Sequence, residues 1–442
     1  MAATAILIIG EDTVSLSFLK KIIRFAMKYS KFNVSRFLIK PKITFFCLLL
    51  MVSCKNNGQN QQKNTSVANP PTPSELILGA NRMELYLSEL KNKNIAIVTN
   101  QTGVVKTQLG TYTHLVDTLL QHKINIVKVF APEHGFRGNA DAGEIIKDGK
   151  DTKTGIPIIS LYGKDKKPSV ANLKGIDLVL FDLQDVGVRF YTYISTLHYV
   201  MEACAEQNIP IWVLDRPNPN GHYVDGPVLK PSQKSFVGMH PVPIVYGMTI
   251  GEYAQMINGE GWLSKAIKAP LRVIPLALYQ REQAYDLPVR PSPNLPNAVA
   301  INLYPSLCLF EGTHISVGRG TEMQFQIYGA PYLNKTNFSF VPAPNVGDKK
   351  PLYQGQVCYG EDLSATPRQS KLNLIWLQKA HAESVGVKTV FFNSFFDKLA
   401  GTPELKEQIV NKMTEDEIRK TWQKDLNKFL KIRKKYLIYI EK

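Results

Sequence analysis

The chain has 442 residues, of which 44% are hydrophobic and 20% charged, a composition typical of a soluble globular protein. This length excludes one ordinary hydrophobic core, so two domains are expected. The formal net charge of +16 suits an anionic polymer or surface, but no basic run is interleaved with aromatic residues, so nucleic acid is not an expected partner.

Residues 1–53 are interpreted as an upstream extension followed by a signal peptide. Lys40 and Lys42 precede the apolar run 43–52, which is too short to cross a bilayer but has the length of a signal-peptide core. The run ends in "MVSC", which resembles a bacterial lipobox, so Cys54 is the predicted lipidation site. An ordinary signal peptide followed by a chance cysteine is the alternative.

Residues 54–75 contain the polar stretch "KNNGQNQQKNTSVANPPTPSE" and are predicted to be a disordered tether. We therefore expect a lipoprotein that is anchored to a membrane on the periplasmic side of the cell envelope. The three cysteines beyond Cys54 show no CxxC or Cys/His spacing, so they predict neither a zinc site nor a disulfide framework.

Short apolar segments alternate with helical ones over residues 76–235. The expected strands and helices are 94–100, 113–122, 124–135, 156–163, 176–187, 195–208 and 209–219. Strand, helix and strand in repetition predict an α/β domain with a Rossmann-like, mostly parallel sheet. The G-x-G-x-x-G and Walker A motifs of nucleotide-binding sheets are absent from the sequence.

Residues 236–442 have a different pattern and are expected to form a smaller α+β domain. A proline-rich stretch leads to a predicted helix over 249–257 and a strand over 271–276. A helix is expected near 302–309. The tail "TEDEIRKTWQKDLNKFLKIRKKYLIY" is predicted to be a basic amphipathic helix.

Polar residues follow the expected strands of the first domain. Because parallel strands present their carboxyl ends at one edge of a sheet, these residues are expected to line a cleft. They are Asn100, Glu133, His134, Asp182, Asp185, Arg189, Arg216 and Asn218. Helix capping and turn formation are the alternative role, above all for Asn100.

The carboxylates of this edge suit glycoside hydrolysis, which needs a proton donor and usually a second carboxylate as base or nucleophile. Glu133 follows an apolar strand beside a proline, where partial burial suits a proton donor. The second group is left open among Glu144, in a nearby glycine-containing loop, Asp182, Asp185 and Glu311.

Four arginines in loops rich in glycine, proline or asparagine are candidates for binding a substrate carboxylate: Arg137, Arg189, Arg216 and Arg319. Ion pairing with neighbouring acids is the alternative, for example Arg189 with Asp185, or Arg137 with Glu133.

Tyr191 and Tyr193, in "RFYTYIS", are candidates for stacking on a sugar ring, with packing at the start of a helix as the alternative. His134 could bind a metal together with Asp182 and Asp185, but no HExxH or other tight ligand spacing supports this. No GxSxG motif supports serine catalysis.

Several long motifs together resemble the bacterial exo-β-N-acetylmuramidase (NamZ) family: "TNQTG", "FAPEHGFRG", "FDLQDVGVRFYTY", "LDRPNPNG", "EGTHISVGRGT" and "FDKLAGTPELKEQI". They occur in order over about residues 80–440. The resemblance implies a Rossmann-like subdomain, a smaller C-terminal subdomain and an active site between them. It also implies release of N-acetylmuramic acid from the non-reducing ends of peptidoglycan fragments, without a cofactor.

The same resemblance implies that Glu133 is the essential acid, with Glu144 ranked above Asp182 as its partner, and that the loop arginines bind the lactyl carboxylate of the substrate. One departure is His314, where asparagine is more usual. Two rivals remain. A non-catalytic, lipid-anchored glycan-binding protein would not need Glu133, and a metal hydrolase would lose its activity in a chelator.

Overall fold

The computed structural model describes residues 75–133, 135–137, 148–388 and 390–441. These residues fall within one unit, 71–442. The predicted signal peptide, most of the predicted tether, Cys54, His134 and Glu144 lie outside the described residues. None of the described helices has both the length and the hydrophobicity that crossing a bilayer requires.

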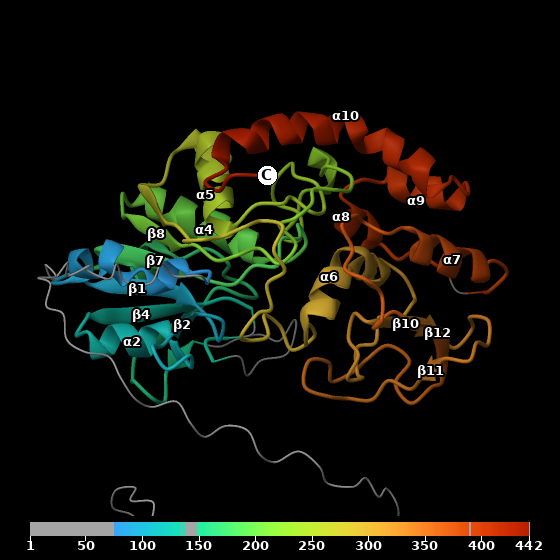
Figure 1. Ribbon diagram of the computed structural model, residues 1–442, viewed down its shortest axis with the longest axis horizontal. Coiled ribbons are helices and arrows are strands. Elements are labelled where there is room, and N and C mark those ends of the chain that lie inside the picture. Colours follow the sequence, from blue (N-terminus) through green and yellow to red (C-terminus); the bar gives the residue numbers. More distant parts are fainter. Residues whose placement is uncertain (1–74, 134, 138–147, 389, 442) are drawn as a thin grey trace, which may run out of the picture. The chain divides into compact units, whose positions relative to one another are not determined.

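A seven-stranded sheet forms the first part of the chain, in the order β5-β6-β4-β1-β7-β8-β9 (Figure 1). Only the short β5 runs antiparallel to its neighbour, so the predicted mostly parallel α/β sheet is confirmed. The strands are β1 Ile95–Thr99, β4 Ile126–Ala131, β5 Gly149–Lys150, β6 Pro157–Ser160, β7 Leu178–Asp182, β8 Ile211–Leu214 and β9 Leu271–Ile274. β9 comes from beyond residue 235 and pairs with β8.

Alternate residues of each central strand enter two separate cores, because successive side chains of a strand point to opposite faces. In β1, Ala96 and Val98 join the core under α4 (Tyr193–Glu206) and α5 (Ile250–Gly259), whereas Ile95 and Ile97 join the core under α2 (Leu115–Gln121). Figure 1 shows these helices on the two faces of the sheet. Burial of both faces explains why the central strands are continuous apolar runs.

The second part of the chain carries α6 (Ala298–Leu307) and a three-stranded antiparallel sheet in the order β10-β12-β11. The remaining bounds are β10 Ile327–Ala330, β11 Ser339–Phe340, β12 Cys358–Asp362, α7 Ile375–Glu383, α8 Phe396–Ala400, α9 Glu404–Val410 and α10 Glu415–Arg433. Earlier in the chain lie the hairpin β2 (Val104–Lys106) and β3 (Tyr112–His114), and the short helix α3 (Val170–Leu173).

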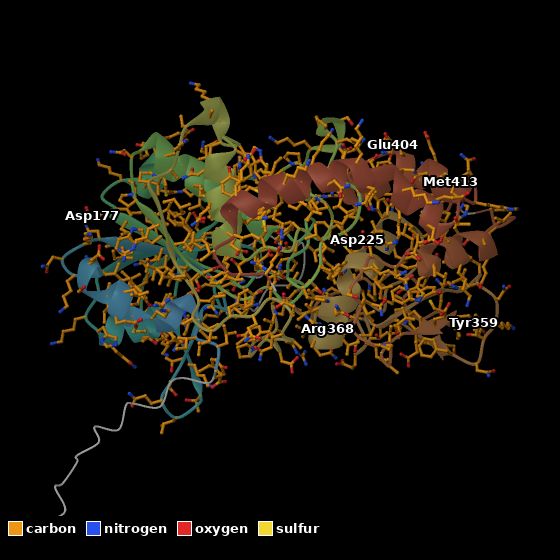
Figure 2. The ribbon with its side chains drawn as sticks, turned by 45° about the horizontal axis from the view of Figure 1, so that its top comes forward. Asp177, Asp225, Tyr359, Arg368, Glu404 and Met413 are labelled. Atoms are coloured by element: carbon orange, nitrogen blue, oxygen red, sulfur yellow. The ribbon has the colours of Figure 1, made fainter. Side chains whose placement is uncertain are left out.

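Polar contacts join the segment after β8 to the C-terminal part of the chain. The Asp225 carboxylate lies 2.7 Å from the Arg419 guanidinium and accepts the Leu372 backbone N–H at 2.7 Å. Arg368 lies 2.8 Å from the ring of His222. Figure 2 labels Asp225 and Arg368. The Asp225–Arg419 pair anchors α10 on the segment after β8.

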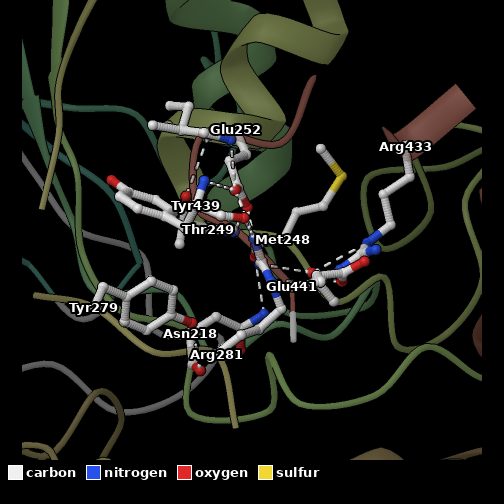
Figure 3. A network of polar contacts seen from close by, with 12 residues as sticks. Asn218, Met248, Thr249, Glu252, Tyr279, Arg281, Arg433, Tyr439 and Glu441 are labelled. Carbon is white, nitrogen blue, oxygen red and sulfur yellow. Dashed lines mark hydrogen bonds and ion pairs between the residues drawn. The ribbon is translucent and has the colours of Figure 1, made fainter. Parts of the chain in front are cut away.

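The predicted C-terminal helix was too long at its end, because α10 stops at Arg433 and the following residues bond elsewhere. Glu252 of α5 accepts hydrogen bonds from the Ile438 and Tyr439 backbone N–H groups and pairs with Arg281 (Figure 3). The Tyr439 hydroxyl donates to Asp215, just past β8, at 2.5 Å. These buried acceptors hold the tail in a non-helical conformation against the main sheet.

A buried histidine pair makes the free energy of unfolding depend on pH. His198 Nδ1 lies 2.9 Å from His240 Nε2. Burial lowers the pKa of His198 to about 4 and that of His240 well below its ordinary value. Below the unfolded pKa of about 6.5, acid protonates these histidines in the unfolded chain first, so stability falls as the pH drops towards 4.

Replacing His198 with glutamine is therefore expected to reduce the sensitivity to acid. Between about pH 7 and pH 4.5, the wild type should lose about 2–3 kcal/mol more unfolding free energy than the variant. Asp185 and Asp215, whose pKa values burial raises to about 6 and about 7, favour the folded state at low pH in both proteins, so the comparison isolates the histidine. Urea unfolding at the two pH values measures the difference, and equal losses would contradict the prediction.

Candidate active site

Glu133 stands at the carboxyl end of β4, separated from the last strand residue by one proline. The Tyr162 hydroxyl donates to its Oε1 at 3.0 Å, and the Thr192 hydroxyl donates to its Oε2 at 3.1 Å. Tyr162 follows β6 and Thr192 is the N-cap of α4. Burial and the neighbouring Glu133 raise the pKa of Tyr162, so the phenol keeps its proton and remains a donor.

Asn100, Tyr191 and Tyr193 meet at the same edge of the sheet. Asn100 Nδ2 donates to the Tyr193 hydroxyl at 2.5 Å, and its Oδ1 accepts the Thr102 backbone N–H at 2.9 Å. The Tyr191 hydroxyl donates to the Pro291 carbonyl at 2.7 Å. Both tyrosine rings are buried against each other, with centroids 4.8 Å apart. This is the packing at a helix start that the sequence left as the alternative to sugar stacking.

Asp182 and Arg216 form a buried ion pair. Arg216 Nε lies 2.6 Å from Asp182 Oδ1, and Nη2 lies 2.9 Å from Oδ2. Arg216 also donates to the Val104 carbonyl at 3.1 Å, and both charged side chains are shielded from solvent. The pair thus ties the end of β7 to the loop after β8 and to β2.

Asp185 and Arg189 each have partners other than one another. Asp185 Oδ2 accepts the Gly187 backbone N–H at 2.6 Å and the Tyr246 hydroxyl. Arg189 is fully buried and donates to four backbone carbonyls, those of Pro227, Val242, Leu399 and Ala400. Arg189 therefore joins three segments of the chain.

The remaining predicted residues are also engaged within the protein. Arg137 pairs with Asp151 at 2.8 Å and with Asp117 at 3.3 Å. Despite burial, hydrogen bonds from Lys153 and Arg137 hold the pKa of Asp117 below its usual value, and the bond from Arg137 does the same for Asp151. Arg319 Nε donates to Glu311 Oε1 at 2.7 Å. Asn218 Nδ2 donates to the Met248 carbonyl at 2.8 Å. All four predicted arginines therefore bond to groups of the protein itself.

Sequence reasoning missed a polar cavity of about 440 Å³, lined by Gln101, Arg290, Glu322, Gln324 and Asn345 together with Val289, Pro293 and Val346. We call it the Arg290 cavity. Gln101 Nε2 donates to the Arg290 carbonyl at 3.2 Å, so the wall of this cavity adjoins the edge that carries Asn100 and Tyr193. Gln101 belongs to the motif "TNQTG", but nothing in the sequence placed Arg290 beside it.

A larger cavity of about 830 Å³ lies elsewhere, lined by residues that include Tyr112, Tyr279 and Tyr285 but not Glu133. Within the described ranges, no group of three or more histidine, cysteine, aspartate or glutamate side chains is arranged to hold a metal ion.

Two domain models match the chain, "Exo-beta-N-acetylmuramidase NamZ, N-terminal" over residues 95–299 and its C-terminal counterpart over residues 302–439. A curated relative, the peptidoglycan beta-N-acetylmuramidase NamZ of Bacillus subtilis (strain 168), is 40% identical over 375 residues, which cover 80% of this chain and 89% of the relative.

Two solved structures of DUF1343 family proteins from Bacteroides fragilis NCTC 9343 have similar folds. One is 44% identical with a TM-score of 0.76, and the match covers 84% of this chain and 100% of the other. The second is 28% identical with a TM-score of 0.67, and the match covers 83% and 99%.

Proposed function

The chain belongs to the NamZ family of exo-beta-N-acetylmuramidases, and we propose that it releases N-acetylmuramic acid from the non-reducing ends of peptidoglycan fragments. It is a glycoside hydrolase, and its relationship to the curated Bacillus subtilis enzyme supports peptidoglycan as its substrate. The exo mode and the catalytic groups are the parts of the proposal that need experiment.

The position of Glu133 carries the chemical proposal. Its carboxyl group stands at the carboxyl edge of a parallel sheet, where ligands of such sheets bind. In the proposed reaction, Glu133 gives its proton to the glycosidic oxygen as the bond to the sugar C1 breaks, and water supplies the new hydroxyl at C1 and loses its other proton to a carboxylate that acts as base. The Tyr162 and Thr192 hydroxyls then hydrogen-bond the carboxylate that remains.

The second carboxylate is proposed to be Glu144, which lies outside the described residues. Asp182 suits this role less well, because Arg216 binds both of its oxygens in a buried pair. Glu311 is paired with Arg319 through one of its two oxygens. Asp185 accepts hydrogen bonds from Gly187 and Tyr246 through one of its two oxygens.

We further propose that the protein is a lipoprotein attached to a membrane through Cys54 and acts in the periplasm. The support is the "MVSC" pattern after an apolar run and the polar stretch that follows. The mass of the N-terminal peptide from the membrane fraction tests this. A peptide that begins elsewhere, or an unmodified Cys54, would exclude the anchor.

The exo mode predicts how much product each glycan strand gives. Strands that carry N-acetylmuramic acid at the non-reducing end and a label at the reducing end should release about one equivalent of free N-acetylmuramic acid. The labelled strand should become one sugar shorter and then persist, because its new end is N-acetylglucosamine. Mass spectrometry follows both products over time. Labelled internal fragments at early times would instead indicate endo cleavage.

A further inference from the structure

Arg290 differs from the other described arginines in the bonding of its guanidinium group. Within the described residues, it is the arginine whose side chain makes no hydrogen bond or ion pair. The others bond to carboxylates, carbonyls or a histidine. Arg290 is exposed and lines the Arg290 cavity. A guanidinium group without a partner, beside a cavity, is free to bind an anion in a two-pronged geometry.

The wall of the same cavity carries unsatisfied acceptors. Gln101 Oε1, Gln324 Oε1 and Asn345 Oδ1 are buried, and none has a hydrogen-bond partner among the described residues. Buried polar atoms normally have partners, so three unpaired oxygens around one cavity point to a ligand with several donors. Gln324 itself is 4% exposed.

The orientation of two of these amides is set by their nitrogen atoms. Gln101 Nε2 donates to the Arg290 carbonyl at 3.2 Å, and Asn345 Nδ2 donates to the Thr321 carbonyl at 3.0 Å. Exchanging oxygen and nitrogen would place each amide oxygen against a carbonyl oxygen, so the oxygen is the atom left for a ligand. These oxygens have almost no accessible surface, and a turn of each side chain towards the cavity would present them to hydroxyl and N–H donors.

The other charged residue that lines the cavity is the exposed Glu322. Its carboxylate accepts hydrogen bonds from hydroxyl groups but repels an anion. A ligand with both hydroxyls and a carboxylate is therefore oriented, with its carboxylate towards Arg290 and its hydroxyls towards Glu322 and the amides.

One scaffold connects the Arg290 cavity to Glu133. The Pro291 carbonyl, next to Arg290, accepts the Tyr191 hydroxyl at 2.7 Å and the Tyr193 hydroxyl at 3.4 Å. Tyr193 follows Thr192, whose hydroxyl donates to Glu133. Two buried tyrosines that flank Thr192 therefore link the residue after Arg290 to the residue that bonds the proposed acid.

We propose that the Arg290 cavity binds the N-acetylmuramic acid unit of the glycan. Arg290 binds its lactyl carboxylate, and the three amide oxygens accept hydrogen bonds from its hydroxyl and N–H groups. This inference rests on the proposed function and gives it a site of recognition. Arg290 selects muramic acid over glucosamine, and the amides bind the features that the two sugars share.

Free N-acetylmuramic acid and N-acetylglucosamine are matched probes, because they differ only in the lactyl group. Saturation-transfer NMR on the full chain measures the affinity for each. The wild type should bind N-acetylmuramic acid at least about tenfold more tightly. Arg290→Ala should weaken the binding of N-acetylmuramic acid by about 10–100-fold and the binding of N-acetylglucosamine by less than about twofold. The affinity of Arg290→Lys for N-acetylmuramic acid should lie between those of the wild type and Arg290→Ala.

Two further variants separate the carboxylate contact from the rest of the cavity. Gln324→Met removes one hydrogen-bond acceptor while keeping a side chain of similar volume, and it should weaken the binding of both sugars by about 3–10-fold. Arg272→Ala removes an arginine that pairs with Glu89 outside the cavity, so it should change neither affinity. Equal weakening of both sugars by Arg290→Ala, or no weakening of either, would overturn the assignment.

The same proteins distinguish failure of this site from failure of the enzyme. A disaccharide of N-acetylmuramic acid linked to N-acetylglucosamine serves as the substrate. If the wild type hydrolyses this disaccharide but Arg290→Ala keeps the full preference for binding N-acetylmuramic acid, the cavity assignment is wrong and the proposed function stands. If binding depends on Arg290 but no hydrolysis occurs, the assignment stands and the proposed function is wrong.

Discussion

Replacing Glu133 with glutamine is expected to lower kcat by about 10²–10⁴-fold, because the amide cannot give a proton to the glycosidic oxygen. Glutamine has nearly the same size, and its single carbonyl oxygen keeps one of the two acceptors that Tyr162 and Thr192 use. The melting temperature should therefore change by less than about 2 °C. Steady-state hydrolysis of the muramoyl disaccharide and thermal unfolding measure the two effects.

The matched control is Glu84→Gln, which changes an acid that is 64% exposed and should leave kcat unchanged. A second pair of variants, Tyr162→Phe and Thr192→Val, removes one hydroxyl each from the proposed acid and should lower kcat by about tenfold. A folded Glu133→Gln protein with the kcat of the wild type would show that Glu133 is not the proton donor.

Breaking the Asp182–Arg216 pair is expected to have the largest effect on stability. Removing one partner leaves the other charge buried and unpaired, which costs about 3–5 kcal/mol. Asp182→Asn and Arg216→Met should each lower the unfolding free energy by this order, because both side chains are almost fully buried and joined by two short contacts. Chemical denaturation measures the change.

The double variant Asp182→Leu/Arg216→Met is the control for this prediction. It removes both charges together, so its cost should be smaller than that of either single change. The comparison also tests the catalytic role that the sequence suggested for Asp182. An Asp182→Asn protein with normal stability and kcat lowered by about 10²-fold or more would identify Asp182 as a catalytic group.

The architecture of the main sheet was predictable because its central strands are buried on both faces. Each strand must then be a short apolar run, and runs such as 94–100 and 176–187 are visible without alignment. Where contacts over long sequence separations decide the structure, the prediction was incomplete. The C-terminal helix ends at Arg433 because Glu252, far back in the chain, binds the residues that follow.

For the candidate site, the sequence predicted positions better than contacts. Asn100 and Glu133 were expected at one edge of the sheet, and they lie just past β1 and β4 because parallel strands end together, while their roles in the reaction stay predictions. The partners of the arginines were not predictable. Arg189 binds carbonyls more than two hundred residues away, and Arg137 binds Asp117 on another element. Arg290 was missed because its proposed role depends on its having no side-chain partner among the described residues, which only the folded structure reveals.

The most direct test of the central claim is incubation of the protein with a disaccharide of N-acetylmuramic acid linked to N-acetylglucosamine, with chitobiose in a parallel reaction. Mass spectrometry follows the free sugars. Steady accumulation of N-acetylmuramic acid from the first substrate, with chitobiose intact, is the predicted result. Saturable binding of the disaccharide by folded protein, without any release of N-acetylmuramic acid, would contradict the account and indicate a glycan-binding protein.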